Sequence, residues 1–318
     1  MRSGVLVMRY GVPYKGSKNS IAEWVYSHFP KADNFYDLFA GGCAITHYAL
    51  IQNDYKRYFL NDVSDIPQLF LDAIKGKFKN EKRWISREDF NRLKNQELYI
   101  RYCWSFGNRG QEYLYSKELE PYKKAVHIAI MENDNTLLNK CFPGYDFSFL
   151  DVISDKKLKR LTLQSFMKNR RVGYDTPMMS CIDVMEISQN IARLQGLEAL
   201  ESLERLESLE RLESFNTSYE NIKILPNSII YCDIPYFETD NYGNNFDYER
   251  FYSWCERQTE PLFISEYWMP EDRFECIDSI EKTVTLQSGA GNKAVEKLFI
   301  PRHQKYDKWQ GTLFEGIL

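Results

Sequence analysis

Residues 34–62 read NFYDLFAGGCAITHYALIQNDYKRYFLND. The aromatic-rich run Asn34–Ala40 predicts a short strand, and two glycines follow it directly. Residues 43–52 then carry apolar side chains at helical spacing, and Arg57–Leu60 predicts a second strand that stops at Asn61-Asp62. This order of strand, glycine turn, helix, strand and acid is typical of the first half of a nucleoside-binding α/β unit.

The two glycines and the aspartate of this segment limit which ligands it can bind. Gly41 and Gly42 remove two β-carbons where a ligand must approach the backbone, although a purely structural turn explains them as well. Asp62 stands where a carboxylate accepts hydrogen bonds from ribose hydroxyls. The chain has neither GxGxxG nor a phosphate-cradling GxxxxGK[ST]. A nucleoside cofactor without phosphate, such as S-adenosylmethionine, meets both constraints.

The α/β pattern resumes only after residue 216. Ser228–Cys232 predicts a buried strand, residues 247–257 a helix and residues 262–265 another strand. Two β-branched runs, residues 282–287 and 295–300, lie on either side of SGAGNKA and predict a hairpin. The sheet is therefore expected to be split by a long insertion.

A compact polar site follows the strand Ser228–Cys232. It consists of a carboxylate at Asp233, a backbone carbonyl at Ile234, then Pro235 and an aromatic ring at Tyr236. The carboxylate and the carbonyl can accept the two hydrogens of a planar amine while the ring stacks on its heterocycle. Turns of the form Asp-X-Pro are common at strand ends, so the tetrapeptide alone is weak support for this function.

Length and composition exclude several classes of protein. With 318 residues, 43% apolar and 27% charged, the chain has ample material for a packed core of one or two domains. No apolar run approaches the roughly 18 to 20 residues of a membrane span. Seven single cysteines without a CxxC pair suit a reducing cytoplasm, and four histidines without metal spacing predict no metal site.

Three regions differ in composition. We expect residues 1–74 and 216–318 to form a cofactor-binding catalytic domain and residues 75–196 to form a mainly helical insertion. Residues 197–215 place leucines three residues apart, which gives no continuous stripe on an α-helix. We interpret this stretch as a duplicated, low-complexity spacer, with an ordered interaction element as the alternative.

The net charge of −4 hides a strong segregation of charge. Residues 75–124 hold thirteen Lys or Arg against seven Asp or Glu, and residues 151–174 hold seven against two. Residues 197–215 reverse this, with six Glu against two Arg. The basic middle favours a polyanion-binding face, for which a solvated helical surface is the alternative.

Taken together, the motifs resemble those of the N6-adenine DNA methyltransferases, the family that includes the bacterial and phage DNA adenine methylases. PYKGSK at residues 13–18 is similar to the family's N-terminal cofactor motif, with Ser17 in place of its second glycine. Other segments resemble the remaining motifs of the family: DLFAGGCAIT at 37–46, LND at 60–62, SFGNRGQEY at 105–113, SY at 218–219, FISEY at 263–267 and EKLFI at 296–300. YCDIPY resembles the catalytic [DNS]PP[YF] motif, with Ile234 where proline is usual.

The resemblance implies a class I methyltransferase: an α/β, Rossmann-like sheet with a closing antiparallel hairpin, interrupted by a mainly helical DNA-recognition domain. The implied reaction is site-specific methyl transfer from S-adenosylmethionine to the N6 amine of an adenine flipped out of duplex DNA. Asp233, Ile234, Pro235 and Tyr236 would be catalytic. The cofactor residues would be Tyr14, Lys18, Asp37, Phe39, Gly41, Asp62 and Tyr219, with Asp37 facing the methionine ammonium. DNA contacts are predicted for Asn108, Arg109, Lys123 and Lys124.

Two alternatives remain at this point. A methyltransferase acting on RNA or protein shares the same kind of tetrapeptide, and a non-catalytic DNA-binding module could retain a decayed site at Ile234. The joint presence of Asp62, Asp233 and Tyr236 favours a working enzyme. Its expected setting is the cytoplasm of a bacterial or phage-infected cell, with DNA as partner and no membrane contact.

Overall fold

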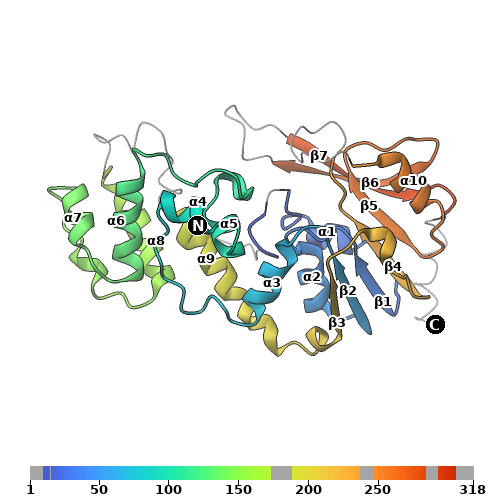
Figure 1. Cartoon of the computed structure of the whole chain (residues 1–318), viewed down its shortest axis with the longest axis horizontal. Coiled ribbons are helices and arrows are strands. Elements are labelled where there is room, and N and C mark those ends of the chain that lie inside the picture. Colours follow the sequence, from blue (N-terminus) through green and yellow to red (C-terminus); the bar gives the residue numbers. More distant parts are fainter. Residues whose placement is uncertain (1–9, 15, 173–187, 237–245, 284–292, 306–318) are drawn as a thin grey trace. The chain divides into compact units, whose positions relative to one another are not determined.

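The chain folds into two compact units in a computed structural model that describes residues 10–14, 16–172, 188–236, 246–283 and 293–305. The sheet unit comprises Met1–Gly11, Ser17–Pro67 and Leu203–Leu318, and the helical unit comprises Val12–Gly16 and Gln68–Ser202. Figure 1 colours them along the sequence. The split sheet with one long insertion is as the sequence predicts, although the unit boundaries differ from the expected 74/75 and 196/197.

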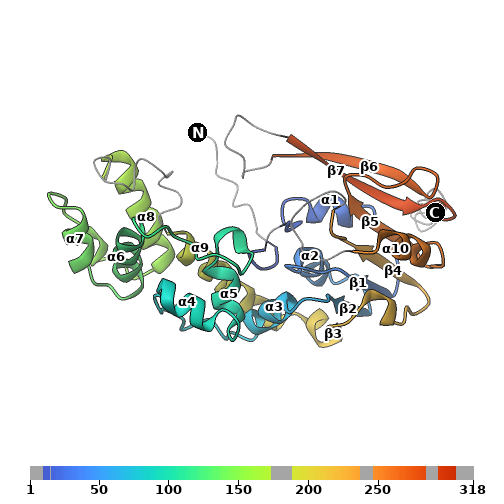
Figure 2. The same cartoon turned by 45° about the horizontal axis from the view of Figure 1, so that its top comes forward.

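One seven-stranded sheet forms the sheet unit, with the order β3-β2-β1-β4-β5-β7-β6. The first five strands are parallel, and β7 runs antiparallel to both β5 and β6 (Figure 1). Figure 2 shows β6 and β7 as the long strand pair at one edge. The strands are β1 Asn34–Asp37, β2 Arg57–Asn61, β3 Leu212–Phe215, β4 Ser228–Cys232, β5 Leu262–Glu266, β6 Phe274–Thr283 and β7 Lys293–Pro301. This confirms the class I methyltransferase sheet with its closing hairpin.

Both faces of the sheet are covered, because successive side chains of a strand point to opposite sides. On one face Tyr36, Ile230 and Ile264 pack with Phe251 and Trp254 of α10 (Tyr248–Cys255). On the other face the ring of Phe29 packs against those of Phe35, Tyr231 and Phe263. The near-continuous apolar sequence of these strands follows from burial on both sides. The remaining helices of the unit are α1 Ala22–Tyr26, α2 Ala44–Gln52 and the 3₁₀ turns η5 Glu207–Arg211 and η6 Tyr219–Asn221.

Strand boundaries agree with the sequence where the strands are buried. β4 has the predicted bounds, and β1 ends at Asp37, before the apolar run does. β6 begins at Phe274, eight positions before the predicted start at residue 282. Over residues 274–281 two exposed positions separate each buried or half-buried one, at Phe274, Ile277 and Ile280, and the pairing is irregular between Cys276 and Asp278. The strict alternation that predicts a strand is therefore missing.

The helical unit contains short helices around an aromatic core. Trp104 and Phe90 are fully buried there, and Trp84 packs edge-on against Trp104 with ring centroids 5.1 Å apart. Among the described residues no helix has the length and apolar sequence that crossing a membrane would require. The helices are α4 Arg87–Leu93, α5 Leu98–Cys103, η1 Phe106–Asn108, α6 Glu120–Met131, α7 Thr136–Cys141, η2 Ser148–Leu150, α8 Lys156–Asn169 and α9 Gln189–Ala199. α3 Ile66–Ile74 and η4 Leu200–Arg205 span the two unit boundaries.

The leucine repeat at residues 197–215, which we expected to be a spacer, has regular secondary structure. It continues α9 as the 3₁₀ turns η4 and η5 and ends in strand β3, which pairs with β2. A 3₁₀ helix has three residues per turn, so residues three apart share one face. Leu200 and Leu203 are accordingly buried, and the Ser208 hydroxyl donates to the Leu50 carbonyl at 2.7 Å. The three-residue spacing thus gives a buried leucine pair in η4, whereas in η5 the buried side chain is Ser208 and Leu209 is half-buried.

Candidate active site

Three predicted carboxylates gather at the carboxyl edge of the parallel strands. Asp37 ends β1, while Asp62 and Asp233 directly follow β2 and β4. Asp37 pairs in register with Leu60 on one side and Tyr231 on the other, which brings the three strand ends together. Ligands of open α/β sheets bind at this edge, and the three predicted carboxylates lie there.

A tight turn after β1 presents backbone groups to this edge. Gly41 has φ +46° and Cys43 has φ +60°, both in the left-handed region that favours glycine. The N–H of Gly41 donates to the Asp62 carboxylate at 2.7 Å. Gly11 packs against the same turn so closely that a β-carbon there would lie 2.1 Å from the Gly42 carbonyl oxygen. Glycine is therefore required at position 11, a residue that our reading of the sequence missed.

Asp37 is a buried carboxylate with one satisfied oxygen. The Thr46 hydroxyl donates to Oδ2 at 2.7 Å, while Oδ1 is buried and has no hydrogen-bond partner among the described residues. Burial raises the pKa of Asp37 to about 7, assisted by the nearby Asp233 and Asp62 carboxylates and opposed by Thr46. A buried acceptor atom without a donor is costly unless a ligand supplies one.

An aromatic cluster lies beside the carboxylates. Phe39 and Tyr219 have ring centroids 5.2 Å apart, and Phe246 lies 5.8 Å from Phe39 and 6.4 Å from Tyr219. All three are partly buried and pack on the core of the sheet unit. Phe39 and Tyr219 were predicted as cofactor residues, and the structure brings them together.

Lys18 connects the predicted catalytic residues. Its ammonium lies 2.6 Å from Oδ1 of Asp233 and 3.3 Å from Oε1 of Glu296 on β7, and it donates to the Tyr236 hydroxyl at 2.5 Å. Tyr236 in turn donates to Glu296. Lys18 is 3% exposed, Glu296 0% and Asp233 21%. Although burial lowers the pKa of Lys18, the two carboxylates raise it above its ordinary value and keep the ammonium charged.

The two middle residues of the tetrapeptide belong to the wall of the site. Ile234 is 2% exposed and packs in the core with α10. The carbonyl of Pro235 accepts a hydrogen bond from the Tyr248 hydroxyl at 3.0 Å. The ring of Tyr267, which follows β5, lies 4.3 Å from that of Tyr236. The turn is thus held by packing and by one hydrogen bond from α10.

In the helical unit the predicted recognition loop, residues 105–113, is a turn held together by hydrogen bonds. Phe106 N–H donates to the Glu112 carbonyl at 2.8 Å, and Gly110 N–H donates to the Ser105 hydroxyl at 2.9 Å. The amide of Asn108 donates to the Tyr102 carbonyl at 2.8 Å, so this side chain supports the loop. Arg109 is exposed at its tip.

The two lysines predicted to contact DNA differ in exposure. Lys124 is exposed, but Lys123 is 1% exposed with its ammonium 5.4 Å from the centre of the Tyr115 ring. Both stand on α6, whose inner face includes position 123. A phosphate contact by Lys123 is therefore incompatible with this packing. Tyr14 belongs to the helical unit and packs edge-on against Tyr102, with centroids 6.3 Å apart.

Residues 14–171 match a family model described as D12 class N6 adenine-specific DNA methyltransferase. The chain belongs to this family. The matched span includes Lys18, Asp37, Asp62 and Arg109 and ends before the tetrapeptide at Asp233. A search of curated proteins finds no match. The methyltransferase therefore acts, as its family does, in N6-adenine methylation of DNA, and the family implies S-adenosylmethionine as methyl donor.

Several site residues escaped sequence reasoning. Glu296 was part of a recognised motif but received no role, although a lone Glu beside the apolar run of β7 marks a buried polar group. Tyr267 likewise belonged to a recognised motif, FISEY, without a role of its own. Phe246 gave no signal, because its position depends on how the loop after β4 folds. Among the described residues, no group of three or more His, Cys, Asp or Glu is arranged to hold a metal ion.

Proposed function

We propose that the methyltransferase transfers a methyl group from S-adenosylmethionine to the N6 amine of an adenine flipped out of duplex DNA. The observation that carries the proposal is the cluster of Asp233, Tyr236 and buried Asp37 at one edge of the sheet. A target amine inside a base pair is out of reach, so the adenine must leave the stack at a cost of a few kcal/mol. The cytoplasm stays the predicted compartment.

The cofactor's chemistry fits the residues on the strand edge. The buried Oδ1 of Asp37 suits a cationic ammonium, which would satisfy it and favour its charged form. Asp62 accepts one backbone N–H on each oxygen, from Gly41 and Ser64, and each oxygen keeps a second acceptor site for a ribose hydroxyl. Phe39 and Tyr219 offer aromatic surface for the adenine. When bound, S-adenosylmethionine supplies an electrophilic methyl group on a sulfonium.

The tetrapeptide would act on the target amine. That amine is a weak nucleophile because its lone pair is delocalised into the ring. Acceptance of its two hydrogens by Asp233 and the Ile234 carbonyl favours a more tetrahedral nitrogen, and Tyr236 stacks on the base. This chain needs no covalent intermediate for that reaction.

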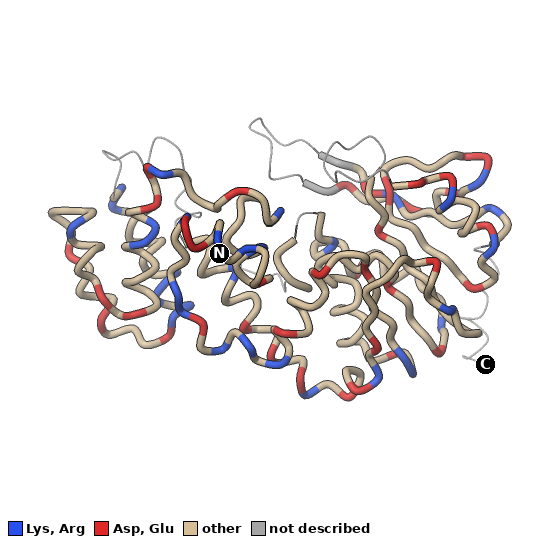
Figure 3. The backbone as a smooth tube through the Cα atoms, in the orientation of Figure 1, with Lys and Arg blue, Asp and Glu red and all other residues tan. Residues whose placement is uncertain are grey.

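Contacts to DNA would come from the helical unit. Arg109 and Lys124 are exposed there, and residues 156–171 hold seven Lys or Arg and no Asp or Glu. Figure 3 shows both signs of charge on both units, so this run is a local feature rather than a property of one unit. Of its basic residues, Lys157, Lys168, Arg170 and Arg171 are exposed. Such residues suit contacts to phosphates.

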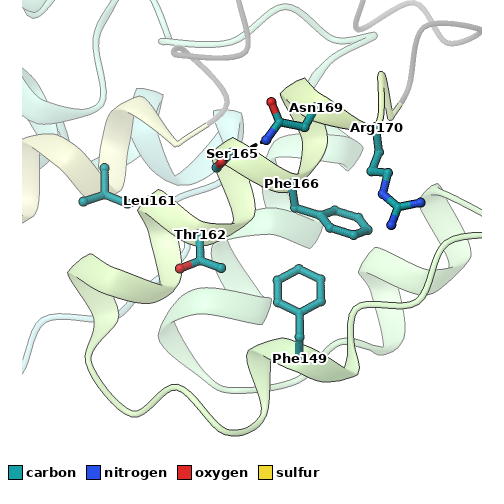
Figure 4. Close-up of a pocket in the computed structure, with 7 residues that line it drawn as sticks. All are labelled: Phe149, Leu161, Thr162, Ser165, Phe166, Asn169 and Arg170. Atoms are coloured by element: carbon teal, nitrogen blue, oxygen red, sulfur yellow. Dashed lines mark hydrogen bonds between the residues drawn. The ribbon is translucent and has the colours of Figure 1, made fainter. Parts of the chain in front are cut away.

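A shallow pocket of about 490 Å³ opens beside these basic residues (Figure 4). Phe149 and Phe166 line it and contact each other, with ring centroids 4.7 Å apart and ring planes inclined by 40°, and the guanidinium of Arg170 lies 6.0 Å from the Phe166 centroid. Ser165 and Asn169 add polar groups to its rim. Aromatic faces next to a guanidinium suit nucleic acid better than an apolar partner.

The test is transfer of a labelled methyl group to DNA, RNA and protein, with two matched variants. Asp233→Ala should bind cofactor normally and lose turnover about a hundredfold or more, since it removes an acceptor acting on the reacting amine. Asp62→Ala should weaken cofactor binding by about 1.5 to 3 kcal/mol per charged hydrogen bond and regain rate at saturating cofactor. Label in RNA or protein instead of DNA would favour the alternative substrates, and wild-type DNA methylation by Asp233→Ala would refute the catalytic assignment.

A further inference from the structure

Glu296 is a fully buried carboxylate that contacts the catalytic tetrapeptide. It stands on β7, while Lys18 precedes α1 and Tyr236 follows β4, so three distant segments meet at one point. Its Oε1 accepts from the Tyr236 hydroxyl and lies 3.3 Å from the Lys18 ammonium. Burying a carboxylate costs free energy unless the charge is paired. The burial of Glu296 beside the predicted catalytic residues therefore needs an explanation.

The Lys18 ammonium matches three acceptors with its three donors. These acceptors are Asp233 at 2.6 Å, the Tyr236 hydroxyl at 2.5 Å and Glu296 at 3.3 Å. Asp233 is the more exposed of the two carboxylates, and Glu296 is closed off from solvent. Under the proposed function Asp233 must also accept a hydrogen bond from the target amine, so it has to share its charge between Lys18 and the substrate.

We propose that Glu296 is a positioning residue for methyl transfer, which holds Lys18 and Tyr236 in place and offsets the Lys18 charge. This inference rests on the proposed function. With two carboxylates and one ammonium, the cluster keeps one negative charge for the amine at Asp233. Without the Glu296 charge, Asp233 carries more of the pairing with Lys18, and the strength of Asp233 as an acceptor for the amine falls.

Glu296 also sets the orientation of Tyr236. The phenol hydroxyl is held between Lys18 and Glu296, and the ring lies 4.3 Å from that of Tyr267. Because hydrogen bonds hold its hydroxyl and Tyr267 contacts its ring, Tyr236 is held in one orientation for stacking on a base. Loss of the Glu296 acceptor frees one of these restraints, so the rate of the chemical step should depend on it more than cofactor affinity does.

The experiment compares Glu296→Gln with Glu275→Gln, a matched change at an exposed position on the neighbouring strand β6. Single-turnover methyl transfer to DNA should fall about 10- to 100-fold in Glu296→Gln, with the dissociation constant for S-adenosylmethionine within about twofold of wild type. Glu275→Gln should match wild type in both. Equal rates in the two variants would overturn the inference.

The pH profile separates positioning from a merely structural role. Loss of the Glu296 charge lowers the pKa of Lys18, because burial opposes its charged form and one of the two carboxylates that raise its pKa is then neutral. The single-turnover rate of Glu296→Gln should therefore decline on the alkaline side at a lower pH than that of wild type, and Glu296→Asp should move it back. A loss of melting temperature with an unchanged pH profile would assign Glu296 to stability alone.

Two outcomes keep the inference distinct from the proposed function. If Asp233→Ala retains the wild-type rate, the proposed function fails, whatever Glu296→Gln does. If Asp233→Ala is inactive while Glu296→Gln behaves like Glu275→Gln, only the inference fails. Should Glu296→Gln not fold, Tyr236→Phe removes the hydrogen bond between Tyr236 and Glu296. This variant should slow single-turnover transfer at least tenfold, and an unchanged rate would also overturn the inference.

Discussion

Asp37 shows how one buried side chain links cofactor binding to pH. Folding raises its pKa from 3.8 to about 7 through burial, so the folded state favours the protonated acid. The stability gained from that preference is complete below pH 3.8 and is lost as the pH rises through about 7. A cationic ammonium reverses the preference, because it pairs with the ionised form.

We therefore predict that cofactor affinity increases as the pH rises from about 6 to 8. Asp37→Asn should bind S-adenosylmethionine at least tenfold more weakly, in line with one lost charged hydrogen bond, and without this pH dependence. Its melting temperature without cofactor should exceed that of wild type at pH 8 and not at pH 4. Calorimetric titration and thermal melts check both points, with exposed Asp272→Asn as control. A pH-dependent affinity in Asp37→Asn would contradict this role.

Ile234 tests whether the departure from the family's usual proline matters. Its side chain packs in the core, while the atom that the reaction requires is its backbone carbonyl. Ile234→Pro should keep the single-turnover rate within about threefold and cost about 1 to 3 kcal/mol through lost packing. Proline also confines Asp233 to extended conformations, which suits a residue that leaves a strand. A large loss of rate with normal folding would show that the flexibility of this turn is needed.

At the scale of elements, the leucine repeat offers a test of whether residues 197–215 are a spacer. Leu203 is 4% exposed, so Leu203→Ala should lower the free energy of unfolding by about 2 to 5 kcal/mol. Leu158→Ala on α8, at a position 55% exposed, should change it by no more than about 0.5 kcal/mol. Urea unfolding measures both. An unchanged midpoint for Leu203→Ala would restore the interpretation as a spacer.

The elements that the sequence predicted well are the strands whose surroundings are apolar on both faces of the sheet. β1 and β4 are buried at every position, and their apolar sequences predict this burial directly. β6 lies at an edge of the sheet and lacks a regular alternation of burial, and the burial of Lys123 depends on what α6 packs against. Glu296 meets Lys18 only through the closing of the hairpin. No pattern within one segment encodes such contacts, because they exist only between segments.

For the whole molecule, net charge is a poor guide to its partner. Despite a charge of −4, DNA affinity should fall steeply with salt, because counterion release depends on local phosphate contacts. About four such contacts predict a loss of roughly a hundredfold between 50 and 200 mM salt. Lys168→Glu with Arg170→Glu should weaken binding to all sequences and flatten this dependence, whereas Lys31→Glu on the sheet unit should not. Affinity that is constant over this salt range would exclude a phosphate-based interface.

The hexapeptide LESLER occurs at residues 200–205 and again at 206–211, and LES follows once more in β3. Tandem copies of this kind invite slippage during replication, which adds or removes six codons without changing the reading frame. Six residues are two full turns at three residues per turn, but leave an α-helix about 240° out of phase. A gain or loss of one copy would therefore add or remove one 3₁₀ turn together with an extended residue of the kind that precedes η5, Leu206. This stretch of the gene can vary in length while the three-residue spacing of its leucines is preserved.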